Sequence, residues 1–344
     1  MASIVGLGSS FPPSLDQHQA WDGFFADHFS NSRVARRVWR AAGVERRHCA
    51  VDPRMEDLSH ASTGERMARF LELAVPLACD AVESAVSNAG IAISDVDLLT
   101  VVSCTGYATP GVDILVAREL GMRPSVERLH IGHMGCYAAL PAVATVSDAA
   151  TARGKCGVVV CVELTSLHVQ PSTDDPEQVV AHALFSDAAA AAVITPNGPG
   201  LDVVDVVALT DRDTAELMTW SVTDAGFRMR LSSKVPSVLD RHVHAVTTEL
   251  LARHGLGIAD VDDWAIHPGG PRIVDTVARR LDLGPDAVAM SRDTLRCHGN
   301  CSSSTTLLVL EALRLRSSAA AGRHVVAMAF GPGLTLYLML LRTS

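Results

Sequence analysis

An internal repeat of about 165 residues constrains the fold of this chain more than any other feature. Residues 88–104 read NAGIAISDVDLLTVVSC, and residues 253–267 read RHGLGIADVDDWAIH. The glycine and the first aspartate of one stretch each lie 165 residues before their counterparts in the other. Both stretches end in a β-rich run after the shared Asp-Val-Asp, which indicates one supersecondary unit that occurs twice.

A second pair of segments supports the same repeat. The glycine-led segment 135–163, GCYAALPAVATVSDAATARGKCGVVVCVE, corresponds to segment 299–330, GNCSSSTTLLVLEALRLRSSAAAGRHVVAMAF. The offset is 164 at the residue after the glycine and 166 at the start of the following apolar run. A nearly constant offset at four landmarks predicts two related halves.

Each half reads as an alternation of helices and strands, which favours a layered α/β fold with helices packed on sheets. The near-continuous apolar runs GVVVCVE and VVAMAF are typical of strands that are buried on both faces. The turn-rich cluster TPNGPGLD at 195–202 is the best boundary between the halves. We therefore expect an N-terminal half at 1–200 and a C-terminal half at 201–344, fused into one body.

Composition excludes several classes of function. The chain has 344 residues, is 48% hydrophobic and carries a net charge of −9, which argues against broad binding of nucleic acid or of an anionic membrane. No basic leader with an apolar core and no run of 18 uncharged apolar residues is present, so a cytoplasmic location without a membrane is expected. The eight cysteines form no paired CxxC motifs, and no metal site is expected.

Three residues at strand ends and helix starts form the candidate catalytic set. Cys136 follows a glycine at the head of a helix expected from about Tyr137 to Arg153, where the helix dipole would lower the pKa of the thiol. Asn300 is its counterpart in the repeat, and His267 follows the strand DDWAIH in the loop HPGGP. If the halves superpose, all three face one interface, which is where active sites of α/β proteins gather.

The motifs GHMGCYAALPA, ALFSDAAAAAVI, AIHPGGPRIVD, GNCSSST and AFGPGLT resemble, in order and spacing, those of the chalcone-synthase-like type III polyketide synthases. The resemblance covers nearly the whole chain. It implies the thiolase-like fold, in which two duplicated halves form a five-layered α-β-α-β-α body. It also implies a homodimer, to which the loop at 104–113 would contribute.

The resemblance further implies roles for individual residues. Cys136 would take an acyl group from a starter coenzyme A thioester, and His267 would hold it as a thiolate. Asn300, with His267, would stabilise the enolate formed when malonyl-CoA loses CO2, and Phe185 would present an apolar face to the departing carboxylate. A condensation of this kind needs a nucleophile that is also a leaving group and neutral donors at the developing oxyanion, and these residue types supply both.

The resemblance also implies substrate contacts. Arg37, Arg40 and Arg272 are the expected contacts to coenzyme A, because an acidic protein that binds this ligand needs a local basic patch. The residues expected to line the pocket are Thr165, His168, Met229 and Tyr137. No cofactor beyond the coenzyme A thioesters is implied.

Alternative functions share parts of this pattern. A ketoacyl synthase III-like acyltransferase, dependent on a carrier protein or non-elongating, has the same Cys, His and Asn, but its histidine loop usually reads His-Gln-Ala-Asn. Papain-like hydrolases also use Cys, His and Asn, but they have no such internal repeat. No single motif encodes the starter, the choice between a malonyl and a methylmalonyl extender, the number of extensions or the mode of cyclisation.

Overall fold

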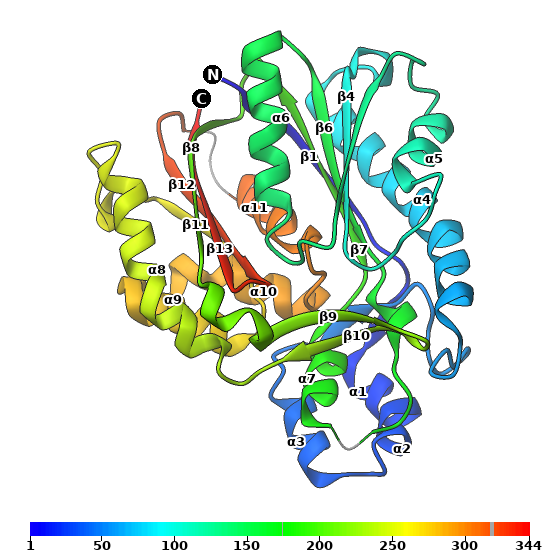
Figure 1. Ribbon diagram of the computed structural model, residues 1–344. Coiled ribbons are helices and arrows are strands. Elements are labelled where there is room, and N and C mark those ends of the chain that lie inside the picture. The colour runs from blue at the N-terminus through cyan, green and yellow to red at the C-terminus, as the bar shows by residue number, and fades with distance from the viewer. Residues whose placement is uncertain (174, 317–319) are drawn as a thin grey trace.

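The computed structural model describes residues 1–173, 175–316 and 320–344, which form one layered α/β body (Figure 1). Its main sheet has nine strands in the order β11-β12-β13-β8-β1-β7-β6-β4-β5. The strands of the first half are β1 (Ser3–Ser10), β4 (Leu98–Ser103), β5 (Glu127–Gly132), β6 (Gly157–Glu163) and β7 (Ala188–Thr195). The strands of the second half are β8 (Leu201–Thr210), β11 (Asp263–Ile266), β12 (His324–Gly331) and β13 (Thr335–Thr343).

The nine strands are two half-sheets that meet at a short seam. β1 and β8 pair only through Ser3 with Asp202 and Ile4 with Leu201, whereas β8 pairs with β13 along nearly its whole length. β4 is parallel to both β5 and β6, and β11 is parallel to β12. Parallel strands of this kind need helical crossovers, which account for the helices on both faces.

Two helices form the middle layer between the half-sheets. α6 (Ala139–Arg153) and α11 (Ser304–Arg316) contribute to one apolar core that also includes strands of both half-sheets. Small residues such as Ala142 and Ala150 let α6 approach its neighbours closely. Figure 1 shows α6 between the strands β8, β12 and β13 on one side and β1 and β6 on the other.

Further helices cover the outer faces. α4 (Thr63–Ala89) and α5 (Val112–Glu119) cover the first half-sheet, and α8 (Val235–Ala252) and α9 (Pro271–Leu281) cover the second. The order of layers is therefore helix, sheet, helix, sheet, helix, which confirms the five-layered thiolase-like body. The start of α4 is fixed by a reciprocal capping box between Ser62 and Glu65.

The repeat is visible in the elements, with one difference. β4, α6 and β6 of the first half correspond to β11, α11 and β12 of the second. β5 separates α5 from α6, but α10 (Ala289–His298) occupies the corresponding place between α9 and α11. α6 begins at Ala139, two residues later than expected, because residues 136–138 form a turn before it.

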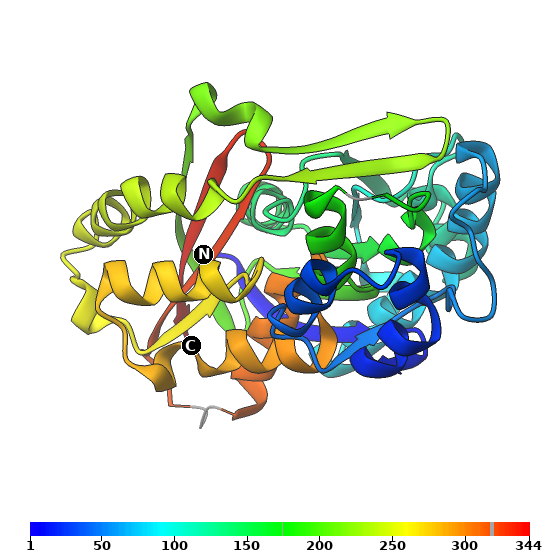
Figure 2. The ribbon, with the colours of Figure 1, turned by 90° about the horizontal axis from the view of Figure 1, so that it is seen from below.

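An N-terminal helical lobe and two hairpins complete the described structure. The lobe contains α1 (Gln17–Ala20), α2 (Ala26–His28) and α3 (Arg33–Arg40), which pack on α7 (Pro176–Leu184) through a mainly apolar core. The short strands β2 (Ser14–Asp16) and β3 (Arg46–His48) pair with each other. β9 (Met218–Thr223) and β10 (Gly226–Leu231) form a long hairpin that reaches from the second half to the start of α4 (Figure 2).

Within the described residues, no helix combines the length and the low polarity that a membrane crossing requires.

Candidate active site

Four of the residues expected to be catalytic line one cavity of about 480 Å³. Cys136 lies in the turn before α6, His267 directly follows β11, Asn300 lies between α10 and α11, and Phe185 directly follows α7. The cavity thus lies where the middle helices begin and where a parallel strand ends, as the repeat predicts.

Glycines allow the two helix starts to approach their neighbours. Gly135 has a φ of 84°, and a Cβ atom there would lie 2.5 Å from Cδ of Pro332. Gly299 has a φ of 74°, and a Cβ atom there would lie 2.7 Å from Cβ of Ser186. Both positions therefore require glycine for their backbone conformation and for space, and each directly precedes a candidate catalytic residue.

Main-chain hydrogen bonds join Phe185 to Asn300. The N–H of Asn300 donates to the carbonyl of Leu184 at 2.9 Å, and the N–H of Ser186 donates to the carbonyl of Asn300 at 3.0 Å. This short parallel bridge brings a residue of the first half next to one of the second. The backbones of Phe185 and Asn300 are therefore held next to each other.

The Cys136 thiol is buried and lies beside a hydroxyl group. Its Sγ is 3.7 Å from Oγ of Ser302, and its side chain is 4% exposed. Burial raises the pKa of the thiol to about 12, with a smaller opposing effect of Ser302. The lowered pKa that the helix start led us to expect is not found in the protein without substrate, where burial is the largest effect and raises the pKa.

The His267 imidazole is buried as a neutral ring. Within the described structure, neither Nδ1 nor Nε2 has a hydrogen-bond partner. Burial lowers the pKa of His267 to about 3, so the ring is uncharged at neutral pH. A buried polar group without a partner is rare in a folded protein, and here it faces a cavity that can hold a ligand.

The Asn300 amide has a defined orientation. Its Oδ1 accepts from the N–H of Ser302 at 2.9 Å, and its Nδ2 is 3.5 Å from the carbonyl of Gly269. Because a backbone N–H can only donate, the oxygen must face Ser302, and the NH2 group faces the carbonyl of Gly269, which also lines the cavity. The amide is therefore positioned as a neutral donor.

The sequence did not predict the cluster of buried polar groups around Glu163, which lies close to Cys136. The buried Glu163 carboxyl, at the end of β6, accepts from the N–H of Cys104 at 3.0 Å, from Thr105 Oγ1 at 2.8 Å and from the Ser303 hydroxyl. Cys104 Sγ lies 3.2 Å from Ser302 Oγ, so the cluster reaches the group next to Cys136. The signal in the sequence was a glutamate that ends an otherwise apolar strand, GVVVCVE.

The rest of the cavity wall is mainly aliphatic. Met229 lies in it, as expected, together with Met218, Leu231 and Ile273. Tyr137 does not line it: the ring is buried and stacks on Tyr337 with centroids 5.7 Å apart. Tyr137 therefore packs beneath the nucleophile.

Thr165 and His168 also lie outside this cavity. Thr165 Oγ1 donates to Asp187 at 3.0 Å, and its side chain faces a separate cavity of about 30 Å³ that Phe185 also borders. His168 Nε2 donates to the Thr105 carbonyl at 2.7 Å, and its Nδ1 accepts from the N–H of Phe227 at 3.0 Å. Both ring nitrogens are occupied, so this histidine has no free donor for a substrate carbonyl.

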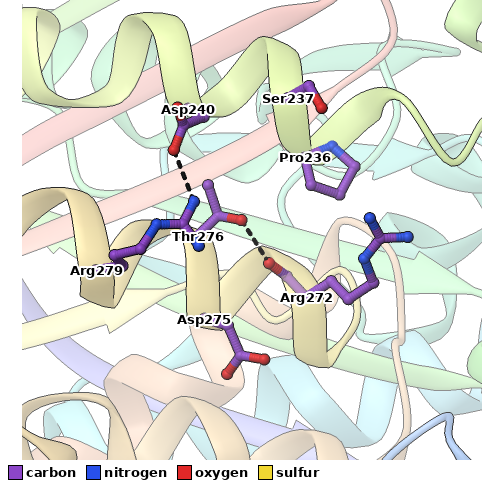
Figure 3. A pocket seen from close by; sticks show the side chains of 7 residues that line it. All are labelled: Pro236, Ser237, Asp240, Arg272, Asp275, Thr276 and Arg279. Atoms are coloured by element: carbon purple, nitrogen blue, oxygen red, sulfur yellow. Dashed lines mark hydrogen bonds and ion pairs between the residues drawn. The ribbon is translucent and has the colours of Figure 1, made fainter.

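Of the three arginines expected to contact coenzyme A, only Arg272 lines the cavity. It stands at the mouth, where the cavity meets a surface pocket of about 410 Å³ (Figure 3). In that pocket Arg279 is paired with Asp240 at 2.7 Å, while the Arg272 guanidinium points away from this pair. Arg37 and Arg40 are exposed on α3, whose residue Val38 lines the cavity.

Comparison with protein families assigns the whole body to one family. Residues 1–199 match the model "Chalcone and stilbene synthases, N-terminal domain", and residues 208–344 match "Chalcone and stilbene synthases, C-terminal domain". These matches support the main functional prediction and not the ketoacyl synthase III-like alternative.

Individual relatives support the same family assignment. The chain is 35% identical to the "Alpha-pyrone synthesis polyketide synthase-like Pks18" of Mycobacterium tuberculosis, over 99% of this chain and 91% of that protein. It is 33% identical to the 1,3,6,8-tetrahydroxynaphthalene synthase of Streptomyces peucetius subsp. caesius, over 99% and 93%. The crystal structure of PKS-I from the brown alga Ectocarpus siliculosus superposes with a TM-score of 0.94 at 29% identity, over 100% of this chain and 98% of that one. The chain belongs to the chalcone and stilbene synthase family and is a type III polyketide synthase, an acyltransferase-type condensing enzyme.

Proposed function

We propose that this enzyme loads an acyl-CoA starter on Cys136 and extends it by decarboxylative condensation with malonyl-CoA-type units. The observation that carries the proposal is the cavity in which a thiol, an unpartnered neutral imidazole and an oriented amide converge. These groups are the nucleophile, the base and the two neutral donors that such a condensation requires.

In the loading step, the Cys136 thiol transfers its proton to His267 and attacks the carbonyl carbon of the starter thioester. The C–S bond to coenzyme A breaks, and the coenzyme A thiolate leaves with a proton from His267. The thiol has a pKa of about 12 without substrate, so ionisation is coupled to attack. A neutral His267 can accept this proton, which an imidazolium could not.

In the extension step, malonyl-CoA loses CO2, and the electron pair of the broken C–C bond forms an enolate. The His267 ring and the Asn300 NH2 group donate hydrogen bonds to the enolate oxygen. The enolate carbon then attacks the acyl carbonyl on Cys136, and the C–Sγ bond breaks with its electron pair on sulfur. The chain leaves as a longer coenzyme A thioester, and Cys136 is regenerated as the thiolate. The apolar face of Phe185 favours this step because it poorly solvates the carboxylate but tolerates neutral CO2.

Coenzyme A enters past Arg272, the basic residue at the cavity mouth. We propose that its guanidinium binds a phosphate group and that the exposed Arg37 and Arg40 add to the basic field on the α3 side. Met229 and Tyr137 would shape the space for the growing chain from the wall and from beneath. By analogy with the relative named for α-pyrone synthesis, a pyrone is the first product to test.

The deciding experiment is mass spectrometry of the protein after incubation with a panel of acyl-CoA starters and malonyl-CoA. We expect an acyl mass on the peptide that contains Cys136 and release of extended polyketides. Cys136→Ala should show neither, whereas the matched control Cys104→Ala should keep the acyl adduct. Acylation of Cys136 without CO2 or extended product from any starter would instead establish a non-elongating acyltransferase.

The homodimer and the cytoplasmic location stay predictions. Light scattering of the purified chain tests the first, and fractionation of the source cells tests the second. A monomer that is fully active would remove any need for residues of a second copy in the site.

A further inference from the structure

Two histidines that do not line the active-site cavity, His48 and His298, form a pair that takes no part in the proposed chemistry. Nε2 of His48, the last residue of β3, lies 3.0 Å from Nδ1 of His298, the last residue of α10. The Phe11 ring covers both imidazoles, with its centroid 4.5 Å from each. His298 belongs to the stretch CHGNC at 297–301, which also contains Asn300.

The hydrogen-bonding pattern fixes the tautomers of the pair. Nδ1 of His48 is 3.0 Å from the Pro12 carbonyl, which can only accept, so this nitrogen carries the proton. Nε2 of a neutral His48 is then an acceptor, and His298 donates to it through Nδ1. Burial lowers the pKa of both histidines, that of His298 to about 4, with Arg46 as a nearby charge that acts in the same direction. Both rings are therefore neutral at neutral pH, and the hydrogen bond has one donor and one acceptor.

Residues 185–187, which include Phe185, lie between the segment that carries His48 and the segment that carries His298 and Asn300. On one side, the N–H of His48 donates to the Ser186 hydroxyl at 2.7 Å, and the N–H of Asp187 donates to the His48 carbonyl at 3.0 Å. On the other side, the two main-chain hydrogen bonds to Asn300 described above join the segments. Three segments thus lie side by side, and the histidine pair links the two outer ones.

His298 lies two residues before Asn300, so its hydrogen bond to His48 restrains the backbone next to the candidate catalytic amide. Only Gly299, with its positive φ, lies between His298 and Asn300. Glycine adds little stiffness to the backbone, so the anchored imidazole is the last side chain that restrains the chain before the amide. Cys136 and His267 are carried by other elements, the turn before α6 and the end of β11.

We infer that His48 and His298 form a positioning clamp that holds Phe185 and Asn300 in register for the decarboxylation step. This inference rests on the proposed function, because it assigns the clamp to the half-reaction in which those two residues act. Loss of the clamp should therefore slow decarboxylation more than loading of the starter. A misplacement of a catalytic group by about 1 Å can cost roughly 100-fold in rate.

The test separates the two half-reactions in matched variants. His298→Leu removes the donor, whereas His298→Asn places an amide NH2 where Nδ1 stood and keeps it. We expect His298→Leu to lower the rate of CO2 release from malonyl-CoA about 10- to 100-fold and to leave the rate of acylation of Cys136 within about threefold. His298→Asn should restore CO2 release to within about threefold of the wild-type rate.

A second pair of variants protects the test against a folding failure of His298→Leu. His48→Gln keeps an acceptor at the position of Nε2, and His48→Met of similar size does not, so the same contrast is expected from the other partner. Equal losses in both half-reactions, or no loss in either, would overturn the clamp. Absence of CO2 release from the wild-type enzyme would overturn the proposed function instead, so the two failures are distinguishable.

Discussion

The ends of two corresponding strands, β4 and β11, serve different purposes in the two halves of this molecule. Cys104 follows β4 in the first half, and His267 follows β11 in the second, 163 residues later. The main-chain N–H and the thiol of Cys104 both contact the Glu163 carboxyl, at 3.0 and 3.4 Å. The His267 ring has no hydrogen-bond partner within the described residues.

This difference indicates that one strand end of the duplicated fold contributes to stability and the other is available for binding. In the first half, polar groups at the strand ends satisfy one another and stabilise the region where the middle helices meet the sheet. In the second half, the histidine at the strand end has both ring nitrogens unpartnered within the described residues, which leaves them available to a ligand at a cost in stability. Substitutions in the first cluster should therefore affect folding, and substitutions at His267 should affect turnover.

The largest expected effect is at His267. His267→Ala should lower kcat/KM for polyketide formation by about 1,000-fold or more, because the proposed base and one of the two proposed donors to the enolate are lost together. The free energy of unfolding should fall little, since the ring gives up no hydrogen bond. Steady-state kinetics and urea unfolding measure the two quantities. A variant that loses stability but keeps its turnover would contradict the comparison.

The next largest effect is the pH dependence of the rate at which iodoacetamide alkylates Cys136. Because the pKa of Cys136 is raised to about 12, the thiolate fraction and the rate of reaction with iodoacetamide should rise about tenfold per pH unit from pH 7 to 9. Cys104 does not line the cavity and should react more slowly at each pH. Peptide mapping by mass spectrometry gives both rates. A fast, pH-independent reaction of Cys136 would show that a thiolate–imidazolium pair already exists without substrate.

Much of this site could be predicted from the sequence, for a physical reason. The repeat places Cys136 and Asn300 at equivalent helix starts, and the run before His267 is a strand whose end must face them. Glycine before each helix start signals a close approach, which the contacts of Gly135 and Gly299 confirm. The convergence of the trio thus follows from periodicity and topology alone.

The direction of individual side chains could not be predicted in this way. His168 faces the hairpin β9–β10, which is distant in sequence and supplies both the N–H of Phe227 and the stacked ring. The helix dipole at Cys136 was visible in the sequence, but the burial that outweighs it depends on the whole tertiary structure. The pair His48–His298 joins segments 250 residues apart, and neither segment alone indicates it.

Stability of the first-half cluster provides the third prediction. Glu163→Ala would leave the N–H of Cys104 and the hydroxyls of Thr105 and Ser303 without their acceptor in a buried site. The free energy of unfolding should fall by about 2–4 kcal/mol, as measured from the urea midpoint and slope. The isosteric control Glu163→Gln should lose less, because the remaining oxygen still accepts from Cys104 and Thr105, and the Ser303 hydroxyl can rotate to accept from the new NH2 group. Equal losses would mean that the charge matters more than the acceptors.

The smallest expected effect concerns Trp220, which lies in the hairpin β9–β10 and contacts Cys104. In the hairpin register, Trp220 lies opposite Met229, and Met218 lies opposite Leu231. Alternate residues of a strand share a face, and three of these four line the cavity while Trp220 does not. Its indole N–H instead donates to the Cys104 carbonyl, and its ring packs edge-on against His168.

Trp220 therefore connects the hairpin that carries three cavity residues to Cys104 of the polar cluster around Glu163. Trp220→Ala should extend the cavity toward that cluster and shift the products by one or more extension units, with a change of about threefold to tenfold in the product ratio, the range expected when a pocket gains room for a small group. Liquid chromatography with mass spectrometry of the products measures this ratio. Trp220→Phe, which keeps an aromatic ring, should shift it less. An unchanged product ratio in Trp220→Ala would show that the length of the chain is set at Met218, Met229 and Leu231, on the second-half side of the cavity.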